Sequence, residues 1–213
     1  MPTGKPLSDS SIAYLSSIAK NQIIIFDGIY SFLMSDKSSR KLGELWKPGN
    51  RLVFFESITK CWGVPSIRGG WATLLNEEDM EYFRIRSLTK VSPPNTLFAF
   101  VAEDCLVNGG VWLRSMKKSI EINRRSVCRF LQAHSNGSSI AFGDEGIFVW
   151  FDASALGIES TNPAIRIIRE GGVALEAGVN YGGNWGKYTR INIACHETIL
   201  DSALKRIERM IKD

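Results

Sequence analysis

An α/β sheet followed by a smaller α+β region is the fold class that the amino-acid sequence predicts. Two short, continuous runs of β-branched and aromatic residues, at 23–26 and 52–55, are typical of strands covered on both faces. A helical pattern precedes the first run. The resulting order of helix, strand, loop and strand is typical of an α/β sheet. Later strand patterns alternate with single helical ones, which indicates a second, smaller α+β domain.

The first half of the chain is expected to supply the larger sheet. Asp9 or Ser10 can cap a helix that begins there. The apolar residues of this helix recur at spacings of three and four: Ile12, Leu15, Ile18 and Ala19. The runs 23–26 and 52–55 follow as strands, and residues 67–75 are predicted as a third strand, interrupted by a pair of glycines.

The second half is expected to open with a long helical segment. A breaker at 92–95 precedes helical periodicity over 96–134, and Gly109–Gly110 should kink or end the first helix. The later elements are a loop at 135–139, strands at 147–151, 173–177 and 190–194, a helix at 163–170, and a final helix with Leu200, Leu204 and Ile207 on one side. The predicted domains are therefore 1–95 and 96–213.

Composition excludes several classes of protein. The 213 residues include 26 Lys and Arg against 22 Asp and Glu, a net charge of +4. Because basic and acidic residues share the same segments, no nucleic-acid partner is expected. Nothing approaches the ~20 apolar residues that a membrane helix needs, and the opening residues lack the order of a secretory signal. Four widely spaced cysteines fit free thiols in a reducing compartment, so we expect a cytoplasmic protein without membrane contact.

Counting residues also removes several common sites. His134 and His196 are the only histidines, and no cysteine cluster stands beside them, so no metal site is expected. No Gly-x-Ser-x-Gly motif is present. The glycine-rich run 182–187 resembles a phosphate loop, but Tyr181 and Tyr188 stand where that loop needs a glycine and a hydroxyl residue of the Ser/Thr type.

Polar side chains remain at the ends of the predicted strands, where α/β sheets place their sites. The candidates, in chain order, are Asp27, Tyr30, Ser57, Lys60, Arg68 and Arg190. The first two follow the first strand, the next two follow the second, and Arg68 comes eight residues after Lys60. Arg190 begins a late apolar strand.

Taken singly, each candidate also has a structural interpretation. An aspartate after a strand is more often a turn or helix cap, and a single lysine is usually a surface residue. Arginines at strand ends are most often ion-pair partners, and a tyrosine is usually a core residue with a satisfied hydroxyl. The order and spacing of the whole set favour a functional site.

In the order of these candidate residues along the chain, the sequence resembles the class I and II aminotransferases of fold type I, which use pyridoxal 5′-phosphate (PLP). Residues 2–4, Pro-Thr-Gly, are similar to the end of the family's Asn-Pro-Thr-Gly motif. Asp27 and Tyr30 match Asp-x-x-Tyr, and residues 57–68 match Ser-x-Ser-Lys followed by the glycine-rich Arg-x-Gly segment. Arg190 matches the arginine of a late hydrophobic strand. The resemblance implies an incomplete PLP-transferase large domain followed by the small α+β C-terminal domain.

The resemblance also implies how PLP is held. Lys60 would bind the cofactor covalently through its amine and would be the catalytic residue that moves a proton. Asp27 would keep the pyridine nitrogen protonated, so that the ring accepts electrons. Tyr30 would hydrogen-bond the phenolic oxygen of the ring, while Arg68 and Ser57 would hold the phosphate.

Arg190 would bind the α-carboxylate of the substrate in a bidentate pair. The implied reaction is transfer of an amino group between an amino acid and a 2-oxo acid. A PLP-dependent carbon–sulfur β-lyase shares these motifs and stays an alternative. A third possibility is a non-catalytic aminotransferase remnant or an interaction protein.

One departure from the family concerns the start of the chain. Met1 stands in the place of the family's asparagine, and family members are about twice this length, so the resemblance is to the C-terminal portion only. The part not matched carries a phosphate-binding turn and the aromatic residue that stacks on the cofactor ring. We therefore expect a truncated chain whose site is completed in a homo-oligomer or by a complementing chain.

Overall fold

The computed structural model describes residues 3–90, 95–136 and 143–212. The chain divides into two compact units, which are described separately below. The first unit is Leu7–Arg114, and the second combines Met1–Pro6 with Ser115–Asp213. This division falls at a different place from the predicted domain boundary between residues 95 and 96, which stays a prediction.

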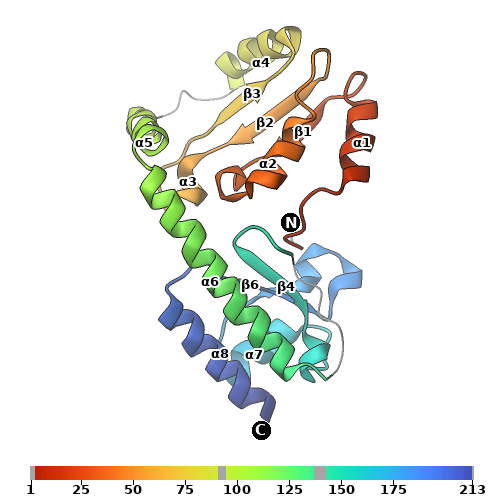
Figure 1. Ribbon diagram of the computed structural model, residues 1–213, viewed down its shortest axis with the longest axis vertical. Coiled ribbons are helices and arrows are strands. Elements are labelled where there is room, and N and C mark those ends of the chain that lie inside the picture. The colour runs from red at the N-terminus through yellow and green to blue at the C-terminus, as the bar shows by residue number, and fades with distance from the viewer. Residues whose placement is uncertain (1–2, 91–94, 137–142, 213) are drawn as a thin grey trace. The chain divides into compact units, whose positions relative to one another are not determined.

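The first unit is built on a three-stranded sheet in the order β1-β2-β3 (Figure 1). Its strands are β1 (Ile24–Asp27), β2 (Leu52–Glu56) and β3 (Trp71–Leu74). β1 and β2 are parallel, with Phe26 opposite Phe54, and β3 is antiparallel to β2. The predicted strands are present, but the third begins at Trp71, after the glycine pair rather than before it.

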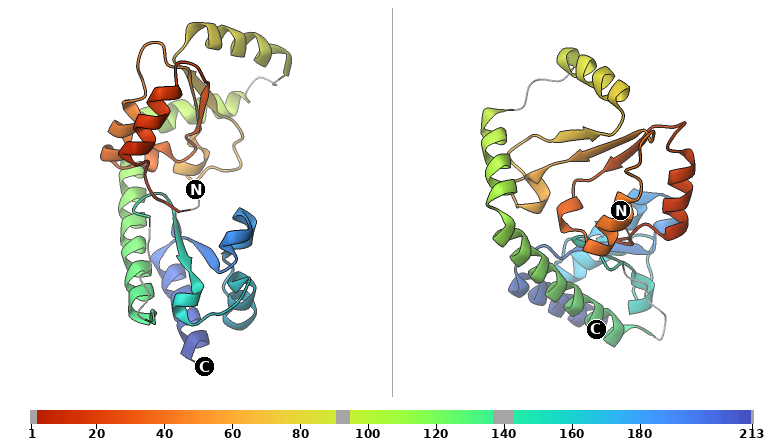
Figure 2. Two further views of the ribbon diagram at one scale, coloured as in Figure 1. Left: turned by 90° about the vertical axis from the view of Figure 1, so that its right-hand side faces the viewer. Right: turned by 45° about the horizontal axis from the view of Figure 1, so that its top comes forward.

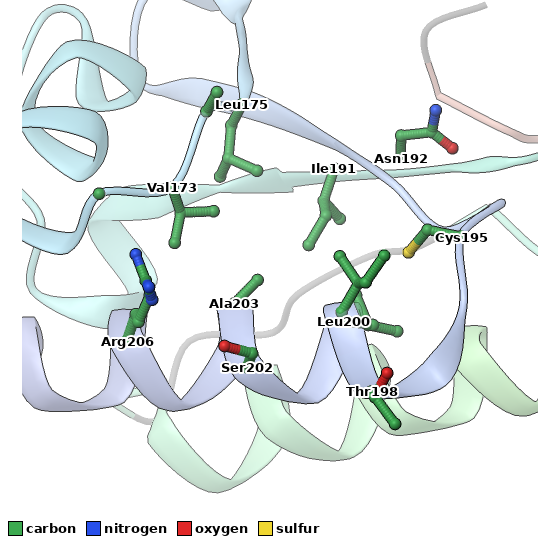
Figure 3. A pocket seen from close by; sticks show the side chains of 13 residues that line it. Val173, Leu175, Ile191, Asn192, Cys195, Thr198, Leu200, Ser202, Ala203 and Arg206 are labelled. Carbon is green, nitrogen blue, oxygen red and sulfur yellow. The ribbon is translucent and has the colours of Figure 1, made fainter.

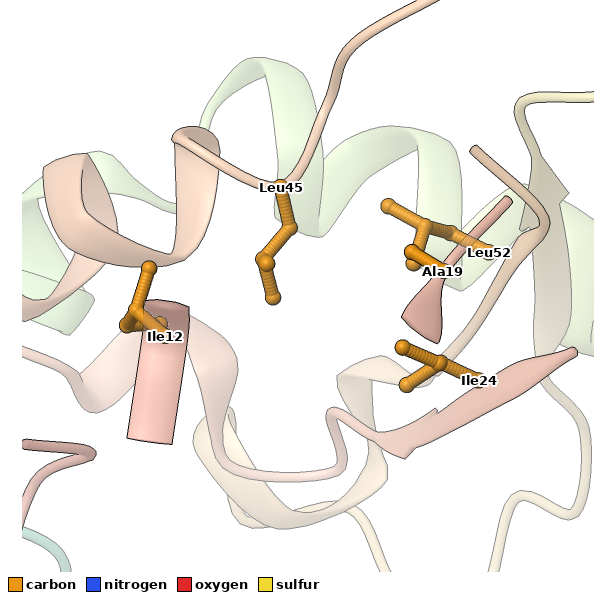
Figure 4. Close-up of a cluster of buried hydrophobic side chains, with 5 residues drawn as sticks. All are labelled: Ile12, Ala19, Ile24, Leu45 and Leu52. Atoms are coloured by element: carbon orange, nitrogen blue, oxygen red, sulfur yellow. The ribbon is translucent and has the colours of Figure 1, made fainter. Parts of the chain in front are cut away.

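Helices α1 (Asp9–Ile18) and α2 (Asp36–Gly43) belong to the same core as β1 and β2. The buried cluster in Figure 4 consists of Ile12, Ala19, Ile24, Leu45 and Leu52. The predicted apolar stripe of α1 is therefore confirmed. The N-cap is Ser8, one residue before the predicted range, because its side chain accepts a hydrogen bond from the backbone N–H of Ser11.

Short helices and two longer ones complete the first unit. These are the 3₁₀ helix η1 (Ser31–Leu33), the single turn α3 (Ile58–Cys61), α4 (Glu77–Lys90) and α5 (Thr96–Val107). Asn95 caps α5, and α6 (Gly110–His134) follows at an angle of 75°. The predicted break at Gly109–Gly110 is thus confirmed. Of the separate helix breaker predicted at 92–95, only Asn95 is described, and residues 92–94 lie outside the described residues.

Helix α4 was not predicted, and few of its side chains are buried. Asp79 is its only buried residue, while Met80, Ile85 and Leu88 are exposed. Arg51, which precedes β2, donates from Nε to Asp79 at 2.9 Å, and a second guanidinium nitrogen contacts the other carboxylate oxygen. This ion pair anchors α4 beside the sheet.

The second unit contains a smaller antiparallel sheet in the order β4-β6-β5. Its elements are β4 (Phe148–Asp152), α7 (Pro163–Gly171), β5 (Glu176–Ala177), β6 (Tyr188–Asn192), α8 (Glu197–Lys212) and the 3₁₀ helices η2 (Ala153–Leu156), η3 (Gly178–Tyr181) and η4 (Gly183–Trp185). The predicted element types are confirmed, although β5 is limited to two residues and β6 begins two residues early. Part of the predicted 135–139 loop, residues 137–139, lies outside the described residues.

Helices α6 and α8 lie side by side in the second unit (Figure 2). The Asn123 side chain of α6 donates to the carbonyl oxygens of Ile193 and Cys195, at 2.9 and 2.8 Å, just before α8 begins. The predicted apolar side of α8 is confirmed, because Leu200, Leu204 and Ile207 are buried.

No single described helix is long and apolar enough to cross a membrane, whereas α5 and α6 together, as a bent pair, reach the length and composition of a span.

The Arg51–Asp79 pair gives a testable pH dependence. The hydrogen bond from Arg51 holds the pKa of the Asp79 carboxyl below its ordinary value of 3.8, so the pair stabilises the fold at neutral pH. That contribution should be lost as the pH falls below 3.8 toward the folded-state pKa. In urea unfolding, Asp79→Asn should lower the free energy of unfolding at neutral pH, and the difference from wild type should shrink in acid. Asp201→Asn, at an exposed position of α8, is the control; equal effects of both variants at neutral pH would contradict the anchoring role.

Candidate active site

The loop after β1 holds Asp27 at the carboxyl end of the sheet. The backbone N–H of Gly28 donates to the carbonyl of Phe55 at 2.7 Å, which ties this loop to the end of β2. A Cβ at Gly28 would lie 2.8 Å from that same carbonyl oxygen, so a side chain does not fit there. The exposed Asp27 carboxylate accepts from the N–H of Ile29 at 3.2 Å and forms no ion pair among the described residues.

Lys60 lies on α3, the single helical turn that follows β2. Ser57 caps this turn by accepting from the N–H of Thr59 at 3.2 Å. Ile58, Thr59 and Cys61 are buried, whereas Lys60 is exposed. Among the described residues, the Lys60 amine has no hydrogen bond or ion pair. The turn therefore presents one free amine from an otherwise buried segment.

The same serine brings the Arg68 segment back to the lysine turn. The Ser57 hydroxyl donates to the carbonyl of Gly69 at 2.7 Å. A Cβ at Gly69 would lie 2.5 Å from ring atoms of Phe98 on α5, and a Cβ at Gly70 would lie 2.8 Å from the Glu56 carbonyl oxygen. Arg68 thus precedes two glycines that pack tightly, and its own side chain is exposed.

Tyr30 is half-buried and stands directly before η1. Cys61 of α3 donates from Sγ to the carbonyl of Ile29 at 3.5 Å, which links the lysine turn to the loop that carries Asp27 and Tyr30. The structure therefore brings Asp27, Tyr30, Ser57, Lys60 and Arg68 to the end of the sheet where β1 and β2 finish.

Sequence analysis missed Glu56, which braces this region. Its carboxylate accepts from the Ser31 hydroxyl at 2.6 Å and from the Trp71 indole N–H at 3.3 Å. Glu56 therefore connects the loop after β1 with the first residue of β3. Its position immediately before Ser57 indicates this role only weakly, since an acidic residue at the end of a strand can also form a turn or a surface ion pair.

Arg190 belongs to the second unit, in the central strand β6. Its guanidinium carbon lies 3.9 Å from the centroid of the Phe148 ring and 5.3 Å from that of Tyr181. The Nε atom is buried without a hydrogen-bond partner among the described residues. Arg190 is therefore held by ring faces rather than by an acid.

A hollow of about 530 Å³ also lies in the second unit (Figure 3). Ile191 of β6 and Val173 face Leu200 and Ala203 of α8 across it. None of the predicted site residues lines this hollow.

The four cysteines are unpaired, with Cys61 buried and the others partly buried. Burial raises the pKa of the thiols of Cys105, Cys128 and Cys195 above the ordinary value. This agrees with the free thiols expected from their spacing.

A family of known proteins matches nearly the whole chain. The model of the aminotransferase class I and II family matches residues 1–207. The chain belongs to this family. Its predicted membership and its incomplete fold type I architecture are both confirmed.

Among curated relatives of this aminotransferase-family chain, cystathionine β-lyase PatB from Bacillus subtilis (strain 168) is 30% identical over 112 residues, which are 52% of this chain and 29% of that protein. A cystathionine β-lyase from Corynebacterium glutamicum is 24% identical over 99% of this chain and 57% of its own length. A PLP-bound structure from Clostridium difficile 630, named as an aminotransferase, is 25% identical with a TM-score of 0.82 and covers 99% of this chain and 56% of its own. The aminotransferase-family chain thus spans between 29% and 57% of the length of these relatives.

The residues at the end of β1 and β2 fit the cofactor that this relative holds. The amine of Lys60 and the carboxylate of Asp27, both without an ion pair among the described residues, and the exposed guanidinium of Arg68 stand on three segments tied together by the hydrogen bonds of Gly28, Ser57 and Cys61. An amine can bind an aldehyde, a carboxylate can face a ring N–H, and a guanidinium can bind a phosphate. This donor set matches the three functional ends of PLP.

The fit of Gly69 beneath Phe98 gives a testable prediction for the site. Gly69→Ala places a methyl group against the ring, so the free energy of unfolding should fall by ~1–3 kcal/mol in urea titration. Gly43→Ala is the matched control, because a Cβ there meets no atom within 4 Å. A Gly69→Ala protein as stable as the Gly43→Ala protein would show that Phe98 does not hold the Arg68 segment.

Proposed function

We propose that this chain forms the lysine-bearing part of a PLP-dependent aminotransferase, which transfers an amino group between an amino acid and a 2-oxo acid. The observation that carries the proposal is the placement of Lys60. Its amine is exposed and unpaired among the described residues, on a buried turn that Ser57 joins to the segment after Arg68. Family membership and a PLP-bound relative support the choice of cofactor.

Each site residue has a role in this proposal. PLP, when bound, supplies a ring that accepts electrons from the substrate. Lys60 binds the cofactor aldehyde and afterwards moves the proton at the substrate α-carbon. Asp27 holds a proton on the ring nitrogen, and Tyr30 donates a hydrogen bond to the ring oxygen. Arg68 binds the phosphate as a bidentate donor.

Ser57 is the second phosphate ligand in this proposal, and its present hydrogen bond sets a condition. The hydroxyl donates to Gly69, so it reaches a phosphate only when that donor rotates away. Arg190 binds the substrate α-carboxylate in this proposal, because its planar guanidinium suits a bidentate pair with a carboxylate.

We propose that the site is completed by residues outside this chain, in a homo-oligomer or a complementing polypeptide. The chain spans about half the length of the relatives that it matches, which supports this. The first unit also exposes large apolar side chains, including Ile25, Leu88 and Phe100. Surfaces of this kind favour contact with another chain or segment.

A carbon–sulfur β-lyase is the second candidate, because two of the curated relatives are named as cystathionine β-lyases. Both reactions need the same proton removal at the α-carbon, and they part only in whether a β-substituent leaves. The residues described above serve either reaction.

Trapping of the cofactor tests the role of Lys60. The chain should react with PLP, and borohydride reduction should leave a stable adduct that peptide mass spectrometry maps to Lys60. The imine absorbance band should disappear in Lys60→Ala and persist in Lys20→Ala, which removes an exposed lysine after α1. Adducts spread over many lysines, and unchanged in Lys60→Ala, would count against a cofactor site.

Product analysis separates the two candidate reactions. The chain should be assayed alone and mixed with a polypeptide that carries the family segment it does not span. An aminotransferase should need a 2-oxo acid acceptor and form a new amino acid, whereas a lyase should release pyruvate from a cysteine-type thioether without an acceptor. Absence of both products in the complemented sample would favour a non-catalytic protein.

A further inference from the structure

Arg190 lies beside an acid with which it does not pair. In the β6 register, Arg190 stands opposite Trp150 of β4 and opposite Glu176 of β5. Opposite charges at directly facing strand positions normally attract one another. Here, however, the Glu176 carboxylate accepts from the Asn180 side-chain amide at 2.8 Å, and no Arg190–Glu176 ion pair is present among the described residues.

Aromatic rings take the place of that acid. Phe148 lies 3.9 Å from the Arg190 guanidinium carbon and Tyr181 lies 5.3 Å from it, measured to the ring centroids. A ring face attracts a guanidinium by its quadrupole and leaves the N–H donors unused. Arg190 therefore keeps both its charge and its terminal donors.

Packing keeps the two rings in place. Phe148 is 8% exposed. Tyr181 meets Trp150 edge-on, with centroids 5.3 Å apart, and Trp150 stacks on Tyr188 at 5.4 Å. The guanidinium is thus held by a rigid aromatic group that spans β4, η3 and β6.

We propose that Phe148 and Tyr181 are positioning residues that hold Arg190 ready for a carboxylate, and that Asn180 keeps Glu176 from neutralising it. This rests on the proposed function only in the choice of ligand, the carboxylate of an amino or 2-oxo acid. Loss of a ring frees the guanidinium to turn toward Glu176. Loss of the Asn180 amide frees Glu176 to turn toward the guanidinium.

The test is a titration of the cofactor-free chain with pyruvate, followed by NMR of the Arg190 Nε–H resonance. The ring at 3.9 Å should displace this resonance from the ordinary arginine range, and Phe148→Leu should abolish the displacement. Phe148→Leu and Tyr181→Leu should each weaken pyruvate binding roughly 5- to 30-fold, whereas Tyr181→Phe, which keeps the ring, should stay within about twofold.

The role of Asn180 is tested by asking whether a second substitution, at Glu176, reverses the effect of replacing Asn180. Asn180→Ala should weaken pyruvate binding, and adding Glu176→Gln should restore it, because the competing carboxylate is then absent. Tyr82→Leu is the matched control, since it removes a similar contact with Arg86, at 5.2 Å, in the other unit, and it should leave pyruvate binding unchanged.

Several results would overturn the inference. These are an Arg190 resonance that pyruvate does not shift, wild-type affinity in both ring-to-leucine variants, or failure of Glu176→Gln to rescue Asn180→Ala. If Phe148→Leu does not fold, the comparison of Tyr181→Leu with Tyr181→Phe decides the ring arm. Because no cofactor is present, failure of PLP trapping at Lys60 would leave these results unaffected, and the two failures are distinguishable.

Discussion

The hydrogen bond from the Ser57 hydroxyl to the Gly69 carbonyl, 2.7 Å long, joins two segments that are twelve positions apart in the chain. On one side of this bond stands the capped turn that carries Lys60. On the other stands the segment that follows Arg68 and packs beneath Phe98. A buried serine that also caps the turn therefore helps to hold a lysine and an arginine from separate segments at one end of the sheet. The hydrogen bond from the Val64 N–H to the Thr59 carbonyl and the pairing of Glu56 with Trp71 support the same arrangement.

The two units hold their charged groups by different physical means. In the first unit, hydrogen bonds to backbone carbonyls arrange Asp27, Lys60 and Arg68 without pairing them with one another. In the second, ring faces hold Arg190, and the Asn180 side-chain amide binds Glu176, the acid opposite it in the β5–β6 register. Both arrangements leave ionic groups without ionic partners among the described residues, and such groups are available to a charged ligand.

Elements with a buried stripe or a β-branched run could be predicted from the sequence, as α1, α8, β1 and β2 illustrate. Helix α4 could not, because its apolar residues such as Ile85 and Leu88 do not face the core of this chain. The ion pair of Asp79 and a ring contact between Phe83 and Phe55 attach it to the sheet. β5 is shorter than its apolar pattern because only Glu176 and Ala177 pair with β6.

The part of the candidate site that could be predicted is the part whose signal lies in spacing along the chain. The motif order pointed to Lys60 and Arg68, since their spacing along the chain carries the signal. The support of Arg190 by Phe148 and Tyr181 depends on cross-strand register and on how the segment 178–185 folds back, neither of which a linear pattern contains. Glu56 was missed because its partners, Ser31 and Trp71, are distant in sequence.

The edge of the first sheet has a consequence for how the protein is made. β1 has a neighbouring strand on one side only in the described sheet, and Ile23 and Ile25 are exposed there. Such an edge pairs with any available strand, including that of an identical chain. During synthesis, β1 is therefore exposed to pairing with the β1 edge of another copy of the chain until something covers it.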